Sequence, residues 1–291
     1  MAFLDTRNLG MQKLIKRTFK GFSEDDMSTY AAALAFSILF SMFPFFLFLI
    51  ALLGFLHLPQ FFSWLREQGE LFFPPVAMEQ INPVIDQLQR QESGLLSFGI
   101  LLALISASRG VRSLMQAMNV VYAVKEARPI WKLYLLSLVY TVGLAMMMLT
   151  AAGLMIVGPQ VLEWLAARVG LQEVVITLWT WLRWPAVILL LTFSVAVMYY
   201  VMPDVEQCFR FITPGSILAV TIWLIASLGF GIYVQNFANY NATYGSIGAI
   251  IVLLLYLYIS ASVLLFGAEM NAVIEHASVD GKDEGEKIIE E

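Results

Sequence analysis

The longest uncharged stretch of the chain lies between Arg210 and Glu269, where the sequence reads FITPGSILAVTIWLIASLGFGIYVQNFANYNATYGSIGAIIVLLLYLYISASVLLFGA. These 58 residues contain no Asp, Glu, Lys or Arg. One membrane-spanning helix needs only about 20 residues, so the stretch is too long for a single span. Its middle, Gln235 to Thr243, holds four Asn or Gln residues. We expect this polar segment to separate two apolar helices.

The composition of the whole chain extends this interpretation. Of 291 residues, 59% are hydrophobic and 13% are charged, against about 45–50% and about 25% in ordinary soluble domains. The mean hydropathy is +0.76, and too few polar side chains exist to cover a water-soluble fold of this size. The net charge of -5 argues against a basic face for nucleic acid. The composition therefore excludes a soluble enzyme, a disordered chain and a nucleic-acid partner.

Further uncharged runs place the remaining spans, because each ionised group in hydrocarbon costs a few kcal/mol or more. We predict an all-α polytopic membrane protein of three parts. A cytoplasmic N-terminal segment covers 1–28, a transmembrane domain covers 29–275, and an acidic, disordered cytoplasmic tail covers 276–291. The six transmembrane helices are expected at about 29–57, 95–118, 133–157, 180–202, 213–234 and 245–272, with an external loop at 58–94 that carries short amphipathic helices.

The distribution of basic residues predicts the orientation of the chain. With a cytoplasmic N-terminus, 13 of the 17 Lys and Arg residues fall on the inside, as the positive-inside rule requires. Both termini are then cytoplasmic. Asp204 and Glu206 lie in an inner loop and are expected to be solvated.

Residues 9–22 have the pattern of an amphipathic helix at the membrane surface. Basic residues recur on one face and apolar residues on the other; the basic set is Lys13, Lys16, Arg17 and Lys20, and the apolar set is Met11, Leu14, Ile15, Phe19 and Phe22. Such a helix suits an anionic cytoplasmic surface. An alternative is that it serves only as a topology signal.

The sequence offers no recognisable catalytic constellation. The two histidines, His57 and His276, fall near opposite membrane faces and cannot share a metal. No metalloprotease, P-loop or nucleophile-elbow motif occurs. We therefore expect no enzymatic activity, no metal and no cofactor.

Charged and polar residues near the inner ends of two predicted helices are candidates for substrate binding. Arg109 and Arg112 are three residues apart, hence on one helix face, where they could hold an anion; the alternative is snorkelling to the interface. Glu269 and the nearby Asn271 belong to the same tentative set. Glu269 could pair with an arginine or carry a proton. Helix arithmetic places Arg109 and Glu269 at similar depth, close enough for direct contact.

A second polar group lies at the predicted outer mouth, between the last two helices. Its uncharged amides and phenols include Asn236, Asn239, Tyr240 and Tyr244. These side chains suit either an external vestibule or a tight structured turn. Tyrosine is also enriched at membrane interfaces.

Several ordered motifs resemble the BrkB/YihY family of bacterial inner-membrane proteins. The resemblance covers about residues 10 to 275; its motifs are Ala31 to Phe36 with Phe43-Pro44, Ser108-Arg109-Gly110 with Asn119 and Tyr122, Pro214-Gly215 with Trp223, Tyr240 to Ser246, and Phe266 to Ala272. It implies six spans and an inner-membrane location, and it suggests transport of anionic solutes or envelope lipid precursors. The family has also been labelled ribonuclease BN, but this sequence contains no nuclease site.

Two functions from different classes follow. The first is a transporter or exporter without its own ATPase, whose cavity is lined by the first, second, fifth and sixth helices and whose substrate is an anionic solute or lipid. The second is a non-transporting envelope scaffold that binds membrane lipids or proteins. The oligomeric state is left open, and a homo-oligomer is compatible with either function.

Overall fold

A computed structural model describes residues 10–55, 95–156, 172–207, 211–236 and 238–277, together with Ser63, Arg66, Asn82, Pro83 and Asp86. The described elements are all helices; they are α1 (Met11–Glu24), α2 (Met27–Phe55), α5 (Leu95–Val121), α6 (Ile130–Ile156), α8 (Gln172–Val201), α9 (Pro214–Asn236) and α10 (Ala238–His276). The predicted all-α class is confirmed. Four segments are long and apolar enough to cross a membrane, namely Ile130–Ala151, Trp181–Val201, Pro214–Val234 and Ile250–His276.

Most helix ends lie within a few residues of the prediction, with two exceptions. Helix α8 begins at Gln172 rather than near 180, and α10 begins at Ala238 rather than near 245. The early turns of α8 carry the charges of Glu173 and Arg183, and the first turns of α10 carry uncharged polar residues. Helical backbone accepts both kinds of side chain, so uncharged apolar runs are shorter than the helices that contain them. The uncharged stretch is divided into two helices as expected, but only one residue separates α9 from α10.

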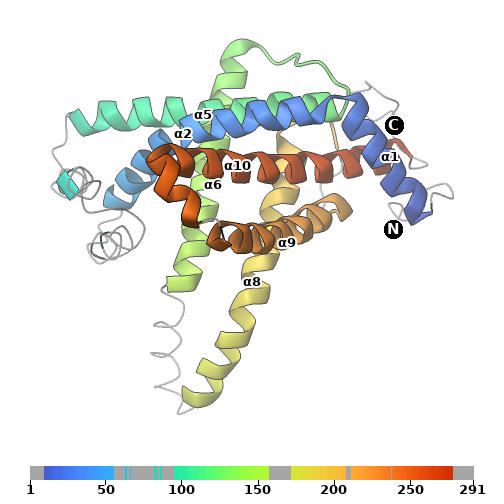
Figure 1. Cartoon of the computed structure of the whole chain (residues 1–291). Helices are drawn as coiled ribbons and strands as arrows, with labels where there is room; N and C mark the ends of the chain where they lie inside the picture. Colours follow the sequence, from blue (N-terminus) through green and yellow to red (C-terminus); the bar gives the residue numbers. More distant parts are fainter. Residues whose placement is uncertain are drawn as a thin grey trace.

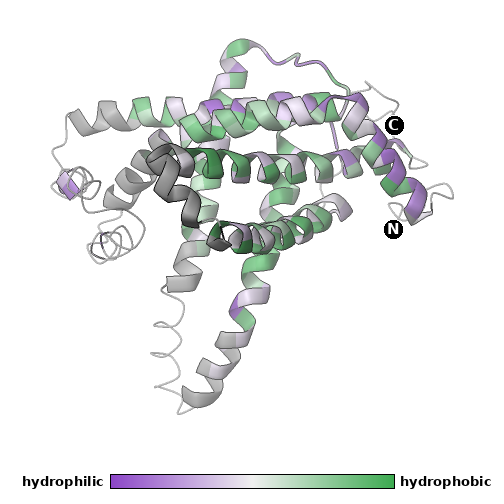
Figure 2. Ribbon diagram, in the orientation of Figure 1, coloured by the Kyte–Doolittle hydropathy of each residue, from purple (hydrophilic) through white to green (hydrophobic). Residues whose placement is uncertain are grey.

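The helices run in two directions (Figure 1). Helices α2, α5 and α10 lie side by side, and α9 packs along α10. Helices α6 and α8 cross this group and extend away from it (Figure 1). Apolar residues follow α6, α8, α9 and α10, whereas hydrophilic residues gather on α1 (Figure 2). The apolar outer surface of these helices is what a hydrocarbon environment requires.

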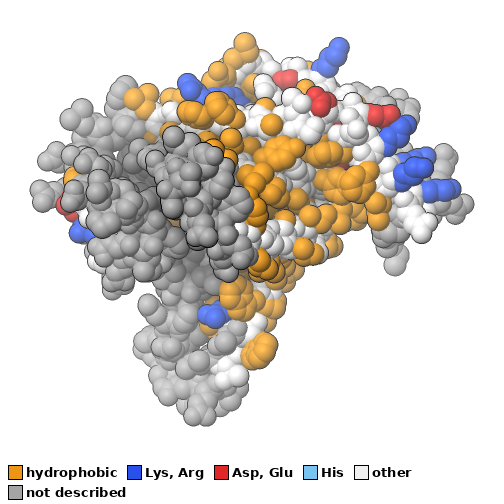
Figure 3. All heavy atoms as spheres, viewed as in Figure 1, with side chains coloured by type: hydrophobic (Ala, Val, Ile, Leu, Met, Phe, Trp, Pro, Cys, Tyr) orange, Lys and Arg blue, Asp and Glu red, His pale blue; other side chains and the backbone are white. Residues whose placement is uncertain are grey.

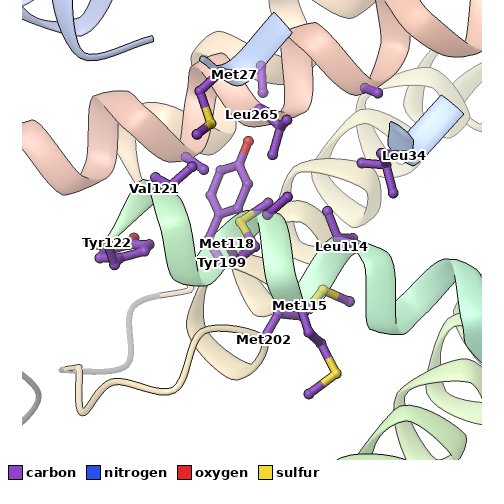
Figure 4. Close-up of a cluster of buried hydrophobic side chains, with 14 of the residues drawn as sticks. Met27, Leu34, Leu114, Met115, Met118, Val121, Tyr122, Tyr199, Met202 and Leu265 are labelled. Carbon is purple, nitrogen blue, oxygen red and sulfur yellow. The ribbon is translucent and has the colours of Figure 1, made fainter. Parts of the chain in front are cut away.

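The largest buried cluster lies where α2, α5, α8 and α10 meet (Figure 4). Tyr199 of α8 is completely enclosed, among Met27, Met118 and Leu265. Its hydroxyl donates a 2.6 Å hydrogen bond to the carbonyl of Leu264. A buried phenol needs such a partner, because an unpaired polar group in an apolar interior costs free energy.

Helices α9 and α10 approach each other through glycines. A Cβ atom on Gly215 would lie 2.0 Å from the carbonyl oxygen of Gly267. A Cβ atom on Gly267 would lie 2.6 Å from both the Gly215 carbonyl and the Tyr199 hydroxyl. Small residues at a crossing let helix backbones touch, and here three helices converge on one point.

The segments predicted to face the cytoplasm lie toward one end of the molecule, together with the last residues of the sixth predicted span (Figure 1). This end is called here the polar end and comprises residues 10–28, 122–129, 202–207, 211–213 and 269–277. Helix α1 packs on the last turns of α10, where Leu14 joins Met270 and Ile274 in a small core. The loop after α5 is hydrogen-bonded to the loop after α8. Charged side chains border this end, whereas hydrophobic side chains cover much of the rest of the same face (Figure 3).

Helix α1 confirms the predicted amphipathic segment and divides it into three sectors. Leu14 and Thr18 are buried against α10. Ile15 and Phe19 remain exposed, although the Phe19 ring also contacts the Phe266 ring at a centroid distance of 4.8 Å. The basic side chains Lys13, Lys16, Arg17 and Lys20 are all exposed.

Candidate functional site

Arg109 lies in the middle of α5, twelve residues before the helix ends at Val121. At 1.5 Å per residue this is about 18 Å from the end of the helix. The side chain is exposed. Within the part of the chain that the structure describes, it forms no hydrogen bond and no ion pair. A cation far from a helix end with no internal partner is available to a ligand.

A cavity of about 400 Å³ adjoins Arg109 at the contact between α2 and α5. Serine hydroxyls and phenyl rings share its wall; the lining residues are Phe36, Ser37, Phe40, Ser41, Pro44, Ser106 and Arg109. The cavity therefore combines one cation, several hydroxyl groups and an apolar rim. It lies between the first two of the four helices that were predicted to line a cavity.

The serines of the cavity are held in place by the α2–α5 packing. The Ser37 and Ser113 hydroxyls are 3.0 Å apart, which joins the two helices directly. Ser41 Oγ donates to the Ile38 carbonyl at 3.2 Å. A Cβ atom on Gly110 would lie 2.6 Å from Ser41 Oγ, so α5 can approach α2 here only because residue 110 is glycine. Each hydroxyl oxygen still has acceptor capacity for a polar ligand, although the one O–H of Ser41 already donates to Ile38.

Arg112 has a different environment from Arg109. Its Nη1 donates to Ser108 Oγ at 2.7 Å and to Ser137 Oγ at 3.0 Å. Its guanidinium carbon lies 4.3 Å from the centre of the Tyr134 ring, within the range of a cation–π interaction. Arg112 therefore fastens α5 to α6. Of the two arginines, only Arg109 lines the cavity.

Glu269 and Asn271 are buried in α10 at the polar end. A Cβ atom on Gly21 would lie 2.0 Å from Glu269 Oε1, so any larger residue at position 21 would require the Glu269 side chain to move. Asn271 Oδ1 accepts a 2.8 Å hydrogen bond from the Gly215 N–H, and its Nδ2 donates to Thr213 Oγ1 at 2.9 Å. Asn271 thus joins the start of α9 to α10.

The structure does not bring Arg109 and Glu269 together. Arg109 faces the α2 segment around Phe40, whereas Glu269 lies against α1. Ala268 belongs to the same buried cluster as Tyr122, which follows the last residue of α5. The predicted similar depth assumed that α5 reaches the inner membrane face near Arg109, although the predicted helix ran to about residue 118. The helix continues for three more turns, which separates the two charges along the bundle.

A polar network that the sequence did not predict joins two loops of the polar end. Arg128 donates from Nε to Glu126 Oε1 at 2.7 Å and from Nη2 to Glu126 Oε2 at 2.9 Å. Arg128 Nε also lies 3.5 Å from Asp204 Oδ1. Asn119 Nδ2 donates to Glu126 Oε2 at 3.0 Å, while Asn119 Oδ1 accepts from the Asp204 N–H at 2.7 Å. Asp204 is therefore a structural partner, and the expectation of a merely solvated carboxylate is wrong.

The network changes the acidity of Glu126. Burial raises the pKa of this carboxyl, but hydrogen bonds from Arg128 and Asn119 and the charge of Arg128 outweigh burial, so its pKa lies below the ordinary value. The carboxylate is 24% exposed and the Arg128 side chain only 8%. The bidentate pair fixes the loop after α5, and the contacts of Arg128 with Asp204 and with the Met202 carbonyl join that loop to the loop after α8.

Other predicted residues lie outside what the structure describes. Asn236 ends α9, and Asn239, Tyr240 and Tyr244 begin α10, but their side chains are outside the described part. His57, Cys208, most of the 58–94 loop and the tail from 278 are also outside it. In that loop the described Arg66 guanidinium donates to the Asp86 carboxylate. Among the described residues no cluster of His, Cys, Asp or Glu could hold a metal.

Long apolar helices, an apolar outer surface and a polar end together define a helical membrane protein of the polytopic class. The sequence matches the virulence factor BrkB family over residues 18–288, and the chain belongs to that family.

Curated relatives share most of the length of the chain. A putative ribonuclease-like protein YfkH of Bacillus subtilis is 33% identical over 89% of this chain and 94% of its own length. A UPF0761 membrane protein of Alteromonas mediterranea is 29% identical over 91% of this chain and 88% of its own. No solved structure matches the chain.

Proposed function

We propose that the chain is a bacterial inner-membrane transporter for anionic substrates and has no enzymatic activity. In this proposal α2 and α5 complete a set of six spans, and the polar end faces the cytoplasm. The observation that supports it best is the exposed Arg109 guanidinium beside the cavity between α2 and α5.

Energetics favour a functional role for this arginine. A cation within a transmembrane segment is costly, and such residues mark substrate or ion pathways. Snorkelling explains cations near helix ends, but about 18 Å of helix separates Arg109 from the end of α5, which is longer than an arginine side chain. Arg112, three residues further on, satisfies its charge internally. The contrast supports a ligand as the partner of Arg109.

Flux through proteoliposomes tests the proposal. Purified protein would be reconstituted, and the efflux of chloride, sulfate and phosphate measured for the unchanged chain and for Arg109→Ala and Arg109→Lys. We expect at least one anion to move, with about a tenfold loss in Arg109→Ala and a smaller loss in Arg109→Lys, because lysine keeps the charge but lacks the planar fork.

The matched control is Arg183→Gln, which removes an arginine that contacts the Trp184 ring at 5.5 Å in α8 and is not part of the cavity. It should leave flux unchanged. Normal folded yield of Arg109→Ala with unchanged flux of the transported anion would contradict the role of Arg109. Absence of flux for all anions in the unchanged chain would favour the scaffold function instead.

The proposed orientation has an independent test in Cys208, the one cysteine of the sequence. A membrane-impermeant maleimide should leave it unlabelled in intact spheroplasts and label it after lysis. Labelling in intact spheroplasts would contradict cytoplasmic termini.

A further inference from the structure

We infer that the Arg109 cavity binds an anionic amphiphile, that is, a ligand with a negatively charged headgroup on a hydrocarbon chain, which enters sideways from the membrane. This inference deepens the proposed function, since it names the substrate class of the same site.

The cavity wall has two chemically different parts. Arg109, Ser37, Ser41 and Ser106 supply a cation and hydroxyl groups from both helices. A guanidinium with neighbouring hydroxyls is suited to an oxyanion, because it donates several hydrogen bonds in a fixed geometry. This part fits a headgroup.

The second part is apolar and faces outward. Phe36 is 56% exposed and Phe40 is 64% exposed, although both line the cavity. Their rings lie together at a centroid distance of 4.5 Å and form a continuous apolar rim. On a span, exposed phenyl rings face lipid. A water-soluble anion gains nothing from this rim, whereas an amphiphile can bind here while its chain stays out of water, where each exposed CH₂ group would cost about 0.8 kcal/mol.

The position of the cation completes the argument. Arg109 lies near the middle of α5, so a headgroup bound to it would be drawn below the membrane surface while its chain stays in hydrocarbon. The ligand would then replace the missing internal partner of Arg109. The site therefore provides polar partners for the headgroup and an apolar surface for the chain of the same ligand.

Equilibrium binding of radiolabelled dodecyl phosphate tests the inference. The full chain would be placed in nanodiscs of neutral phosphatidylcholine, and empty nanodiscs would give the background. We expect saturable binding that Arg109→Gln weakens at least tenfold, while Arg183→Gln binds like the unchanged chain. Ser106→Phe keeps the arginine but fills the cavity, and it should abolish saturable binding without loss of folded yield.

A chain-length series separates the amphiphile from a small anion. Relative to their free concentrations in water, butyl, octyl and dodecyl phosphate should show progressively tighter saturable binding above the empty-nanodisc background, by up to about fourfold per CH₂ group removed from water. Phe40→Ala should reduce that increment. A hundredfold excess of inorganic phosphate should not displace dodecyl phosphate. If inorganic phosphate competes as well as dodecyl phosphate does, the site takes small anions and the inference is wrong, although the proposed transport function stands.

Two further results would also overturn the inference. One is equal competition by dodecyltrimethylammonium, which would show that the site does not distinguish an anionic headgroup from a cationic one. The other is unchanged binding in both Arg109→Gln and Ser106→Phe, which would place the amphiphile elsewhere. Neither result depends on flux, so the inference can fail while anion transport is still observed.

Discussion

Arg128 at the polar end and Arg109 in the α2–α5 cavity place the same side chain in opposite surroundings. Arg128 is 8% exposed and grips Glu126 with two hydrogen bonds, with Asp204 also nearby. Arg109 is exposed and lines a cavity with serines and phenyl rings. Paired polar groups hold the loops together at the polar end, whereas Arg109 in the middle of α5 is an exposed cation. The comparison separates residues that hold the fold from one that is available to a ligand.

The largest effect is expected in the fixed region, at Gly267. Gly267→Ala places a methyl group 2.6 Å from the Gly215 carbonyl and 2.7 Å from the Ala219 Cβ. Backbone atoms cannot move aside cheaply, so we expect a loss of about 3 kcal/mol of stability. Thermal unfolding followed by size-exclusion chromatography measures it.

Gly229→Ala is the matched control for this change, because its new Cβ would meet nothing within 4 Å in a helix of the same pair. The control should be neutral or slightly stabilising. Equal thermal stability of the two variants would show that α9 and α10 are not packed as described.

Next in size is the contrast between the two arginines themselves. Arg128→Ala leaves the Glu126 carboxylate enclosed without its main donor, and we expect a loss of about 2 kcal/mol. Arg109→Ala removes no hydrogen bond or ion pair to any residue that the structure describes, and it should change stability by no more than about 0.5 kcal/mol. Unfolding temperatures of both variants in the same detergent make the comparison. A larger loss in Arg109→Ala than in Arg128→Ala would reverse our assignment of roles.

A smaller effect follows from the lowered pKa of Glu126. A carboxyl whose folded pKa is depressed contributes stability that is fully present above its unfolded pKa of about 4.3 and is lost as pH falls through the lower folded pKa. The unchanged chain should therefore lose more stability between pH 6 and pH 3 than Glu126→Gln does. If stability falls with pH in parallel for the two proteins, the pKa of Glu126 is the same in the folded and unfolded states, which would contradict the prediction.

The smallest effect concerns the end of α5. Ala123 has a φ of 52°, and the Val124 N–H donates to the Asn119 carbonyl, which is the helix ending that usually carries glycine. Ala123→Gly should stabilise the chain by about 1 kcal/mol. Ala32→Gly, at an exposed position inside α2, should destabilise it by a similar amount. Opposite signs in thermal unfolding are the test, and a loss in both variants would contradict it.

Much of the fold follows from where charges are absent. The cost of an ionised group in hydrocarbon is large, so an uncharged run is a strong signal. It placed most ends of the described long helices within a few residues, with the starts of α8 and α10 as exceptions. The same signal fails at helix ends. The polar amides after Asn236 were expected to form a turn, but Asn239 already lies in α10. Helical backbone satisfies its own hydrogen bonds and tolerates such side chains.

The candidate site was predictable only in part. The sequence singles out Arg109 because a charge within an apolar run is rare, but three residues of helix correspond to a turn of about 300°. The remaining offset of about 60° is enough to direct Arg109 toward α2 and Arg112 toward α6. The pairing of Arg128 with Asp204 joins residues 76 positions apart, and no local pattern indicates it. The short spacing of Glu126 and Arg128 was the one available sign.

The meeting of Tyr199, Gly215 and Gly267 limits how this molecule can move. Two helices that pack through side chains can shift along each other, because the side chains can adopt other rotamers. Helices α9 and α10 instead touch through backbone atoms, and the Tyr199 hydroxyl lies against them. Such a contact has no alternative packing at a neighbouring register. In the transport function proposed above, a motion that exposes the cavity first to one side of the membrane and then to the other would have to turn about this point rather than shift along it. The glycine crossing would then act as the stationary axis, and α2 and α5 would carry the displacement.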